Sequence, residues 1–248
     1  SACASFKAEF QVACKLSSNV PNICNIDDFV VDGDKAYLVM KLFDCDLFSF
    51  AFENRDSPLP EEEIKVLFAK ICRALKSVHK RRIAHLDLKP ENILLDTKTM
   101  EPYICDFGSA FISSTPKKTS KRSRSAIQEI PALGARGTRK FSSPEMSLSP
   151  YNYDPFRSDV YSLGVILFTL CTSHFPNVTK DSDGREFTDF SGGKGLMSSG
   201  AYNLLQSIVH PSPAERYSID DILDHEWMPK TSKISTPTRL LRKICTAL

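Results

Sequence analysis

Two stretches of the sequence carry side chains whose types and spacing suit the transfer of a phosphoryl group. The run 85–92 contains Asp87, Lys89 and Asn92, and Asp106 follows nineteen residues after Asp87. Phosphoryl transfer needs a carboxylate that orients the attacking hydroxyl and ligands that hold Mg²⁺ on the phosphates. We expect Asp87 to take the hydroxyl proton. Lys89 points the same way in an extended loop and is expected to steady the transferred charge.

The expected metal ligands are the side-chain oxygens of Asn92 and Asp106. Asn92 lies at the far end of the run, and a returning hairpin would bring Asp106 back to it. Hard cations such as Mg²⁺ prefer oxygen donors of these two kinds. A single Asp or Lys would carry little information, because most charged side chains are solvated surface residues. The combination at this spacing predicts a phosphoryl-transfer site.

The same two stretches resemble the catalytic loop and the Asp-Phe-Gly triplet of the eukaryotic protein kinases. The run 85–92 matches the motif H-x-D-L-x-x-x-N, with an unusual residue, Leu86, at its second position. The sequence Asp-Leu-Lys-Pro-Glu-Asn at 87–92 is typical of Ser/Thr kinases. The resemblance implies an α+β, protein-kinase-like fold, ATP and Mg²⁺ as cofactors, and Ser/Thr hydroxyls of proteins as acceptors. The alternative is a kinase-like binding or scaffold module without activity.

The overall composition argues against several other function classes. A net charge of +2 over 248 residues gives no global field for nucleic acid, and no apolar run is long enough to span a membrane. The eight cysteines include no C-x-x-C pair, so we expect small buried residues rather than a zinc site. Without a secretory signal, the sequence indicates a cytoplasmic or nuclear protein.

The first elements resemble a helix and turn of the kinase small lobe. Residues 4–17 predict a short helix, which the Asn-Val-Pro-Asn-Ile run at 19–23 ends. The apolar residues near helical spacing are Phe6, Phe10, Ala13 and Leu16. Taken alone, Glu9 is an exposed helical acid, whereas the resemblance makes it the glutamate whose family partner is a strand lysine. Residues 25–41 predict a hairpin, because an Asp-Gly pair separates two apolar runs.

The resemblance also assigns residues to the nucleotide and substrate sites. Residues 40–43 match the gatekeeper and hinge, where the family holds adenine through backbone groups. The residues expected at the nucleotide are Glu9, Met40, Asp46, Glu91, Leu94 and Asp106. Asp46 and Glu91 also match the acids with which basophilic relatives pair substrate arginines, whereas ordinary surface acids are the alternative.

The remainder predicts a mainly helical second lobe. Residues 60–82 predict an amphipathic helix with acidic residues in its first turn and basic residues in its last. Residues 157–172 are apolar nearly all round, which is typical of a buried helix. Residues 180–195 are rich in Gly and Asp and predict a loop, and 200–227 predict the final helices. The ending His-Glu-Trp-Met at 225–228 resembles that of calcium/calmodulin-dependent-kinase-like enzymes.

Further matches to the family imply structural contacts. They are Gly137-Thr138 against the catalytic loop, Asp159 on the backbone of that loop, Gly164 at a close helix contact, and Arg216 paired with Glu145.

The activation segment, as the resemblance defines it, is basic and long. Residues 113–136 are rich in Ser, Thr, Lys and Arg, which is typical of a solvated loop or a regulatory insertion. Leu86 replaces the arginine that would bind a phosphate on this segment. We therefore expect dephosphorylation to leave most activity intact, unless Arg136 or Arg139 substitutes.

The family's glycine-rich loop and lysine strand do not occur before Glu9. We expect either a fragment of an active kinase or a natural truncation, and a poor kinase when these 248 residues are made alone. The predicted division is 1–41 as a truncated small β lobe, 42–228 as the helical lobe and 229–248 as a basic tail. The tail is expected to meet a regulatory partner, and Cys245 fits a prenylation motif only loosely.

Overall fold

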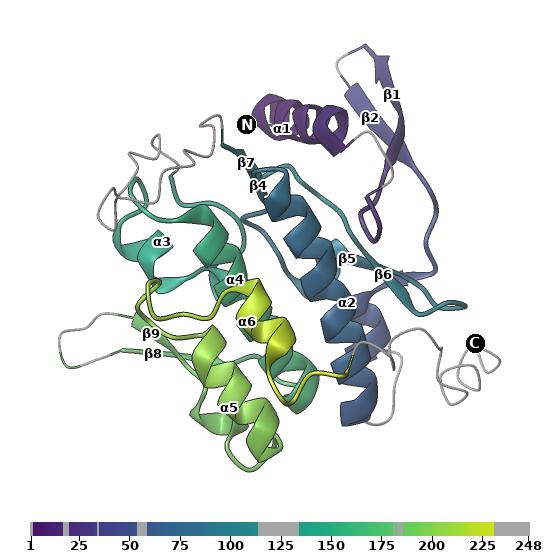
Figure 1. Ribbon diagram of the computed structural model, residues 1–248. Coiled ribbons are helices and arrows are strands. Elements are labelled where there is room, and N and C mark those ends of the chain that lie inside the picture. The colour runs from purple at the N-terminus through teal and green to yellow at the C-terminus, as the bar shows by residue number, and fades with distance from the viewer. Residues whose placement is uncertain are drawn as a thin grey trace, which may run out of the picture.

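The computed structural model describes residues 2–16, 20–33, 35–53, 59–113, 134–180, 182 and 186–230. A helix and a hairpin form a small part above a mainly helical part (Figure 1). In chain order the elements are α1 (Ala2–Leu16), β1 (Ile26–Asp32), β2 (Lys35–Met40), β3 (Cys45–Asp46), η1 (Ser49–Glu53), α2 (Glu61–Lys80), β4 (Ile83–Ala84), η2 (Pro90–Asn92), β5 (Ile93–Asp96), β6 (Glu101–Ile104), β7 (Phe111–Ile112), η3 (Arg139–Phe141), α3 (Pro144–Leu148), α4 (Pro155–Thr172), β8 (Asn177–Lys180), β9 (Glu186–Asp189), η4 (Ser191–Gly193), α5 (Ser199–Ile208) and α6 (Ile219–Asp224). The predicted α+β class is confirmed.

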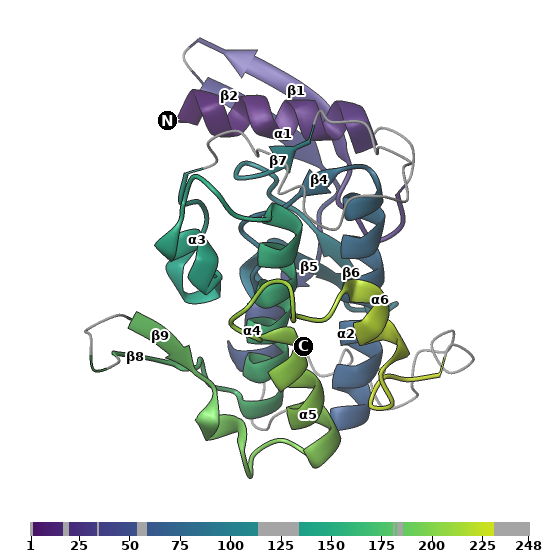
Figure 2. The same cartoon turned by 60° about the vertical axis from the view of Figure 1, so that its left-hand side comes forward.

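Helix α1 uses two faces rather than the single apolar stripe that the spacing predicted. Phe10 is 45% exposed and packs edge-on against Phe29 of β1, with ring centroids 4.8 Å apart. The buried face instead carries Glu9, Val12 and Leu16. Phe10 lies on the other face because the helix lies between the hairpin and the strands β4 and β7 (Figure 2), so its contacts fall on two sides.

The hairpin forms where the Asp-Gly pair predicted it. β1 and β2 are antiparallel, with Phe29 opposite Leu38, and Gly33 in the turn has a φ of 60°, a backbone region that favours glycine. Neither strand contains a buried residue, and Val31 is 71% exposed. The hairpin therefore presents apolar side chains to solvent.

The turn after α1 ties the small part to the helical part. Ile23 forms a parallel bridge with Ile104 of β6, and the Cys24 N–H donates to the Ile104 carbonyl at 2.9 Å. The Asn22 side-chain amide donates to a carboxylate oxygen of Glu101 at 2.9 Å. This turn thus continues the three-stranded sheet β3-β5-β6 by one short bridge.

The core of the helical part is organised around α4. The helix begins at the Asp154 cap, whose carboxylate accepts the N–H groups of Phe156 and Arg157, and it is buried nearly all round as predicted. A Cβ added to Gly164 would lie 2.4 Å from a methyl of Val209, so the close helix contact is confirmed. Helix α2 packs its predicted apolar stripe on the same core, and α5 and α6 complete it.

The prediction of a loop over 180–195 was wrong for part of that range. β8 and β9 form an antiparallel hairpin in which Thr179 lies opposite Phe187, and η4 follows it. The hairpin projects beside α3 (Figure 2). Val178 is 51% and Phe187 is 47% exposed. Strands this short and exposed show no alternation of apolar and polar residues in the sequence. The prediction of a loop therefore followed the Gly and Asp residues.

The cysteines are less buried than their apolar surroundings predicted. Cys72 is the one fully buried thiol among the cysteines that the structure describes, Cys14 is exposed, and the others are half-buried. In the described part of the chain, no helix is long and apolar enough to cross a membrane. The predictions for residues 114–133 and for the tail beyond 230, with Cys245, lie outside the described residues.

Candidate active site

One buried carboxylate of α4 fixes the backbone of the catalytic loop. Asp159 is 0% exposed, and its Oδ2 and Oδ1 accept the backbone N–H groups of His85 at 2.7 Å and Leu86 at 2.8 Å. His79 of α2 places its Nε2 2.8 Å from Asp159 Oδ2. The predicted contact of Asp159 is confirmed, whereas sequence analysis missed His79, which no motif marks.

The loop also depends on an unusual backbone conformation. Leu86 has a φ of 61°, which is uncommon for a branched side chain and requires the surrounding bonds to fix it. Gly137 has a φ of 73°, and a Cβ there would lie within 2.2 Å of the Leu86 carbonyl oxygen. The predicted contact of Gly137-Thr138 with the catalytic loop is confirmed, and only glycine fits its first position.

Two of the predicted site residues, Asp87 and Lys89, contact Thr138, and a third, Asn92, contacts Asp87. The Thr138 N–H donates to Asp87 Oδ1 at 2.8 Å, and Lys89 donates to the Thr138 hydroxyl at 2.9 Å. Lys89 Nζ also lies 3.6 Å from Asp87 Oδ2. The Asn92 amide donates to the Asp87 carbonyl at 2.8 Å. The carboxylate, the ammonium and the amide are therefore fixed relative to one another before any substrate binds.

The Asp-Phe-Gly segment returns to this loop through the sheet. The Cys105 N–H donates to the Asn92 carbonyl at 3.0 Å, which brings Asp106 beside the loop as the hairpin spacing predicted. Asp106 has a φ of 59°, and its Oδ1 accepts the Gly108 N–H at 3.2 Å. Phe107 is 3% exposed and packs against the His85 ring, with centroids 4.8 Å apart.

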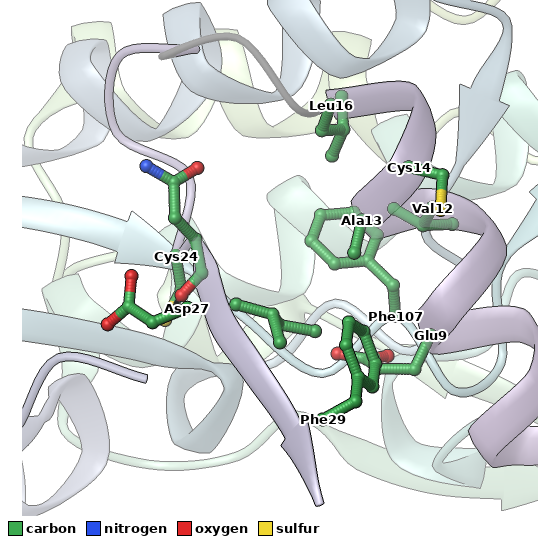
Figure 3. A pocket seen from close by; sticks show the side chains of 11 residues that line it. Glu9, Val12, Ala13, Cys14, Leu16, Cys24, Asp27, Phe29 and Phe107 are labelled. Carbon is green, nitrogen blue, oxygen red and sulfur yellow. Dashed lines mark hydrogen bonds between the residues drawn. The ribbon is translucent and has the colours of Figure 1, made fainter. Parts of the chain in front are cut away.

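Glu9 is buried, whereas its sequence surroundings alone predicted an exposed helical acid. It is 7% exposed and lines a hollow of about 430 Å³ between α1 and β1, with Phe29 and Phe107 on the other walls (Figure 3). Burial, and then the nearby Asp106 carboxylate, raise the pKa of Glu9 to about 7, against a backbone hydrogen bond from Phe107. Among the described side chains, no hydrogen-bond donor reaches Glu9 Oε2.

The residues expected at the adenine end lie on adjoining short elements. Met40 ends β2, and Asp46 of β3 pairs in register with Leu94 of β5. Asp46 already accepts the N–H of Ser49 at 2.9 Å and its hydroxyl at 3.1 Å. Glu91 lies on η2 and is exposed. Asp46 therefore has a local capping contact, whereas Glu91 faces solvent.

Sequence analysis missed two thiols beside these residues. The Cys24 Sγ lies 3.5 Å from the Met40 Sδ. Burial, and then the charge of Glu9, raise the pKa of Cys24 to about 11, and burial raises the pKa of Cys105 to about 12. Both thiols are therefore protonated near neutral pH, and Cys24 places an uncharged group against Met40.

Both ends of the activation segment are fixed, although residues 114–133 lie outside the described part. Arg216 is 2% exposed and binds Glu145 through two hydrogen bonds of 2.6 and 3.0 Å, as predicted. Leu86 is buried in a separate apolar cluster. Its members are Ala84, Leu86, Met146 and Tyr153, with Phe111 and Phe156 packed against them. Leu86 therefore belongs to an apolar cluster that includes residues from both flanks of the segment.

Comparison with known proteins agrees with this geometry. The protein kinase domain family matches residues 2–228. Serine/threonine-protein kinase D2 of Rattus norvegicus is 30% identical over 227 residues, which cover 88% of this chain and 24% of that protein. CBL-interacting serine/threonine-protein kinase 9 of Arabidopsis thaliana is 32% identical over 223 residues, covering 86% of this chain and 45% of that protein. The chain spans less than half the length of these relatives, and it belongs to the protein kinase domain family.

Proposed function

We propose that this chain carries the catalytic machinery of a serine/threonine kinase that transfers the γ-phosphoryl group of ATP to Ser and Thr hydroxyls of proteins. The observation that supports it most is the network in which Thr138 binds Asp87 at 2.8 Å and Lys89 at 2.9 Å. This network holds a carboxylate and a cation beside each other. A hydroxyl placed against Asp87 would therefore also lie near the Lys89 charge, which is the arrangement that phosphoryl transfer requires.

Each site residue has a proposed role in this reaction. Asp87 orients the acceptor hydroxyl and takes its proton, and Lys89 neutralises charge on the transferred group. Asn92 turns its amide nitrogen toward the Asp87 carbonyl, so its oxygen is left as a donor atom for a hard cation beside Asp106. Two oxygen ligands suit Mg²⁺, which takes its remaining ligands from water and phosphates. When bound, Mg²⁺ would supply charge neutralisation at the phosphates.

The proposal is tested by removing the two carboxylates in the full-length protein. Asp87→Asn and Asp106→Ala should each lower phosphoryl transfer by about 10³–10⁵-fold, the range seen for single charge-stabilising groups in such enzymes. Transfer of γ-³²P from ATP to a mixed Ser/Thr peptide pool gives the rate. Glu226→Gln, which changes an exposed acid far along the chain, is the matched control. Near-normal rates in either site variant would contradict the assignment.

We further propose that substrates carry basic residues before the acceptor. Glu91 is exposed on η2, two residues beyond Lys89, and offers a carboxylate to an arginine. Asp46 is the weaker candidate, because both of its oxygens already bind Ser49. An arrayed peptide library should show a preference for Arg that Glu91→Gln reduces and Asp46→Asn leaves nearly unchanged. A proline-directed preference in the unmodified protein would contradict this proposal.

The second candidate function is a kinase-like binding module without activity. It is favoured by Glu9, because no cation pairs with its carboxylate among the described side chains. The discriminating measurement is the affinity for Mg-ATP of residues 1–248, compared with that of the same chain carrying its natural upstream residues. Transfer activity that appears only in the longer chain would support the enzyme. Absence of both binding and transfer in either chain would support the module.

A further inference from the structure

A hollow in the helical part lies apart from the proposed active site. Its volume is about 310 Å³, close to the lower limit of roughly 300–1,000 Å³ for ligand pockets. The start of α2, the end of α4 and the residues before α5 line it, and Figure 1 shows α5 at the end of the molecule opposite to α1. Glu61 is the one acid among the described residues that line it, and apolar walls come from Leu59, Ile64, Leu196 and Met197.

One side of the hollow leaves apolar surface in water. Leu196 is 62% exposed, whereas Ile64 and Met197 of the same hollow are buried. Single exposed leucines are common on protein surfaces, but this one adjoins a recess with buried apolar walls. An apolar side chain placed against Leu196 would therefore extend the core of the helical part.

Glu61 keeps a negative charge at the edge of this hollow. Its Oε1 accepts the indole N–H of Trp227 at 2.8 Å and the Ser198 hydroxyl at 2.9 Å. Burial alone would raise the pKa of Glu61, but these hydrogen bonds and the Lys65 charge lower it below its ordinary value. The Lys65 ammonium lies 3.4 Å from Glu61 and 2.7 Å from Glu62, so two carboxylates share it. The edge of the hollow therefore attracts positive charge.

The described chain ends beside this hollow. Trp227, which binds Glu61, also packs edge-on against Phe68 of α2, with ring centroids 6.5 Å apart. A Cβ added to Gly200 of α5 would lie 3.1 Å from the Trp227 ring, so the indole lies between α2 and α5. Lys230 is the last described residue, and residues 231–248 follow it. The tail therefore leaves the fold a few residues from a wall of the hollow.

Residues 240–244, which we call the tail segment, match the hollow in apolar and charged character. A helix would place the apolar residues of this segment on one face, because they are one, three and four positions apart. They are Leu240, Leu241 and Ile244. Arg242 and Lys243 lie between them, so the segment is also basic. It therefore offers both kinds of side chain that the hollow and its edge can bind.

The connection to the tail segment is long enough to reach the hollow. The ten residues 231–240 span up to about 33 Å when extended, and the hollow begins at Glu61, which Trp227 contacts. A segment on such a tether acts at an effective concentration of about 1 mM. An intrinsic dissociation constant of about 0.1 mM would therefore keep it bound about nine-tenths of the time.

We propose that the tail segment binds in this hollow of its own chain, with its apolar side chains against Leu196 and Met197 and its basic side chains beside Glu61. The opposite charges of the two surfaces and the exit of the chain beside Trp227 favour this segment over an unrelated partner. The contact extends the core of the helical part and uses no residue of the proposed active site. It is therefore independent of the proposed kinase function.

The test is photochemical cross-linking within the chain of residues 1–248. The amino acid p-benzoylphenylalanine is placed at position 241, and peptide mass spectrometry identifies the residues that it joins on illumination. We expect Leu196 or Met197, with a cross-linked fraction that does not change with protein concentration. Cross-links between two copies that increase with concentration, or cross-links only outside the hollow, would overturn the proposal.

Variants of one exposed leucine assign the effect to the hollow. Leu196→Glu should weaken binding at least about tenfold, because an apolar contact is lost and an acid takes its place. The cross-linked fraction should then fall from about nine-tenths to about one half or less. Leu196→Met keeps an apolar side chain and should keep the fraction. Leu148→Glu, which changes an exposed leucine of α3, is the matched control. Equal fractions in Leu196→Glu and Leu148→Glu would contradict binding in the hollow.

Charge variants of the tail test the role of Glu61. Arg242→Gln with Lys243→Gln should weaken binding about two- to fivefold for each exposed ion pair lost. In the unmodified chain, 0.5 M NaCl should lower the cross-linked fraction in the same way, because salt screens exposed charges. A fraction that neither change lowers would contradict the role given to Glu61.

Discussion

The helical part and the small part of this chain differ in how they bury apolar residues. In α4, fifteen of the eighteen residues are buried, and α2 packs its whole apolar stripe on the same core. In β1 and β2 no residue is buried, and Val31 is 71% exposed. Both segments are rich in branched apolar residues, so composition does not cause the difference. Helix α4 packs against α2, α5, β4, η3 and η4, whereas the hairpin packs against α1 through Phe29.

The catalytic loop takes its geometry from the better-packed part. Asp159, Thr138 and Asn92 fix it, and all three belong to the helical part or to the loop itself. The small part contributes Glu9, whose carboxylate lies at the junction beside Phe107. The comparison therefore predicts that changes in α4 disturb the whole site, whereas changes in the hairpin stay local.

The largest expected effect comes from Asp159→Ala. The change would leave the N–H groups of His85 and Leu86 without their acceptor and His79 without its partner, all in a buried setting. We expect the free energy of unfolding to fall by about 3–5 kcal/mol, because each buried donor left without an acceptor costs about 1–3 kcal/mol. Urea unfolding measures it. Asp154→Ala, which removes only the helix cap, should cost about 1 kcal/mol, and equal losses would contradict the anchoring role.

The pH dependence of stability should report on Glu9. Its pKa is raised from 4.5 to about 7 in the folded chain, so the folded state binds a proton that the unfolded state releases. The stabilisation is fully present below pH 4.5 and is lost as the pH rises to about 7. The shift corresponds to roughly 3 kcal/mol. Protection factors of the α1 amides, which are exchange rates corrected for the intrinsic rate at each pH, should fall over this range in the unmodified chain and stay level in Glu9→Gln. Identical pH profiles would show that Glu9 is not buried in solution.

A matched pair of valines compares the two parts directly. Val165 in α4 is 0% exposed and Val31 in β1 is 71% exposed. Val165→Ala should lower the free energy of unfolding by about 2 kcal/mol through lost burial, and Val31→Ala should change it by less than about 0.5 kcal/mol. Thermal unfolding of both variants gives the comparison. A large loss from Val31→Ala would mean that the hairpin face is covered in solution.

The smallest expected effect concerns phosphorylation of the activation segment. Leu86 lies in the apolar cluster with Met146 and Tyr153, so the side chain at this position offers no charge to a phosphate. A phosphate on the segment therefore finds no cation at position 86, where a charge-assisted hydrogen bond would contribute about 1.5–3 kcal/mol. We expect phosphatase treatment to lower activity less than about twofold. A large loss of activity would contradict this expectation. Repeating the treatment on Arg136→Gln would then show whether that arginine binds the phosphate.

The sequence by itself determined the family-specific loop and the elements with strong periodicity. The spacing of Asp87, Lys89, Asn92 and Asp106 gave the site, because a catalytic loop is a local structure whose side-chain order follows chain order. Helices α2 and α4 were predictable for a related reason. A helix with a continuous apolar stripe, or with apolar residues all round, is stable in water only when those residues are buried.

Only the tertiary structure decided the environment of individual residues. From the sequence, Glu9 is interpreted as a solvated acid in a short helix. Its burial depends on Phe29 and Phe107, which distant segments of the chain place beside it. Phe10 fits an apolar stripe but meets the hairpin on another face. The strands β8 and β9 follow from pairing with each other rather than from any alternation of their own.

The same division applies to the catalytic loop. The sequence shows Leu86 as a substitution in the family motif, but its place in an apolar cluster with residues from both flanks of the activation segment appears only in the folded chain. The contact of His79 with Asp159 joins α2 to α4 across eighty residues of sequence. Periodicity reports the average environment of a helix face or strand. The partner of a particular side chain is set by how separate elements pack, and that information is not local in the sequence.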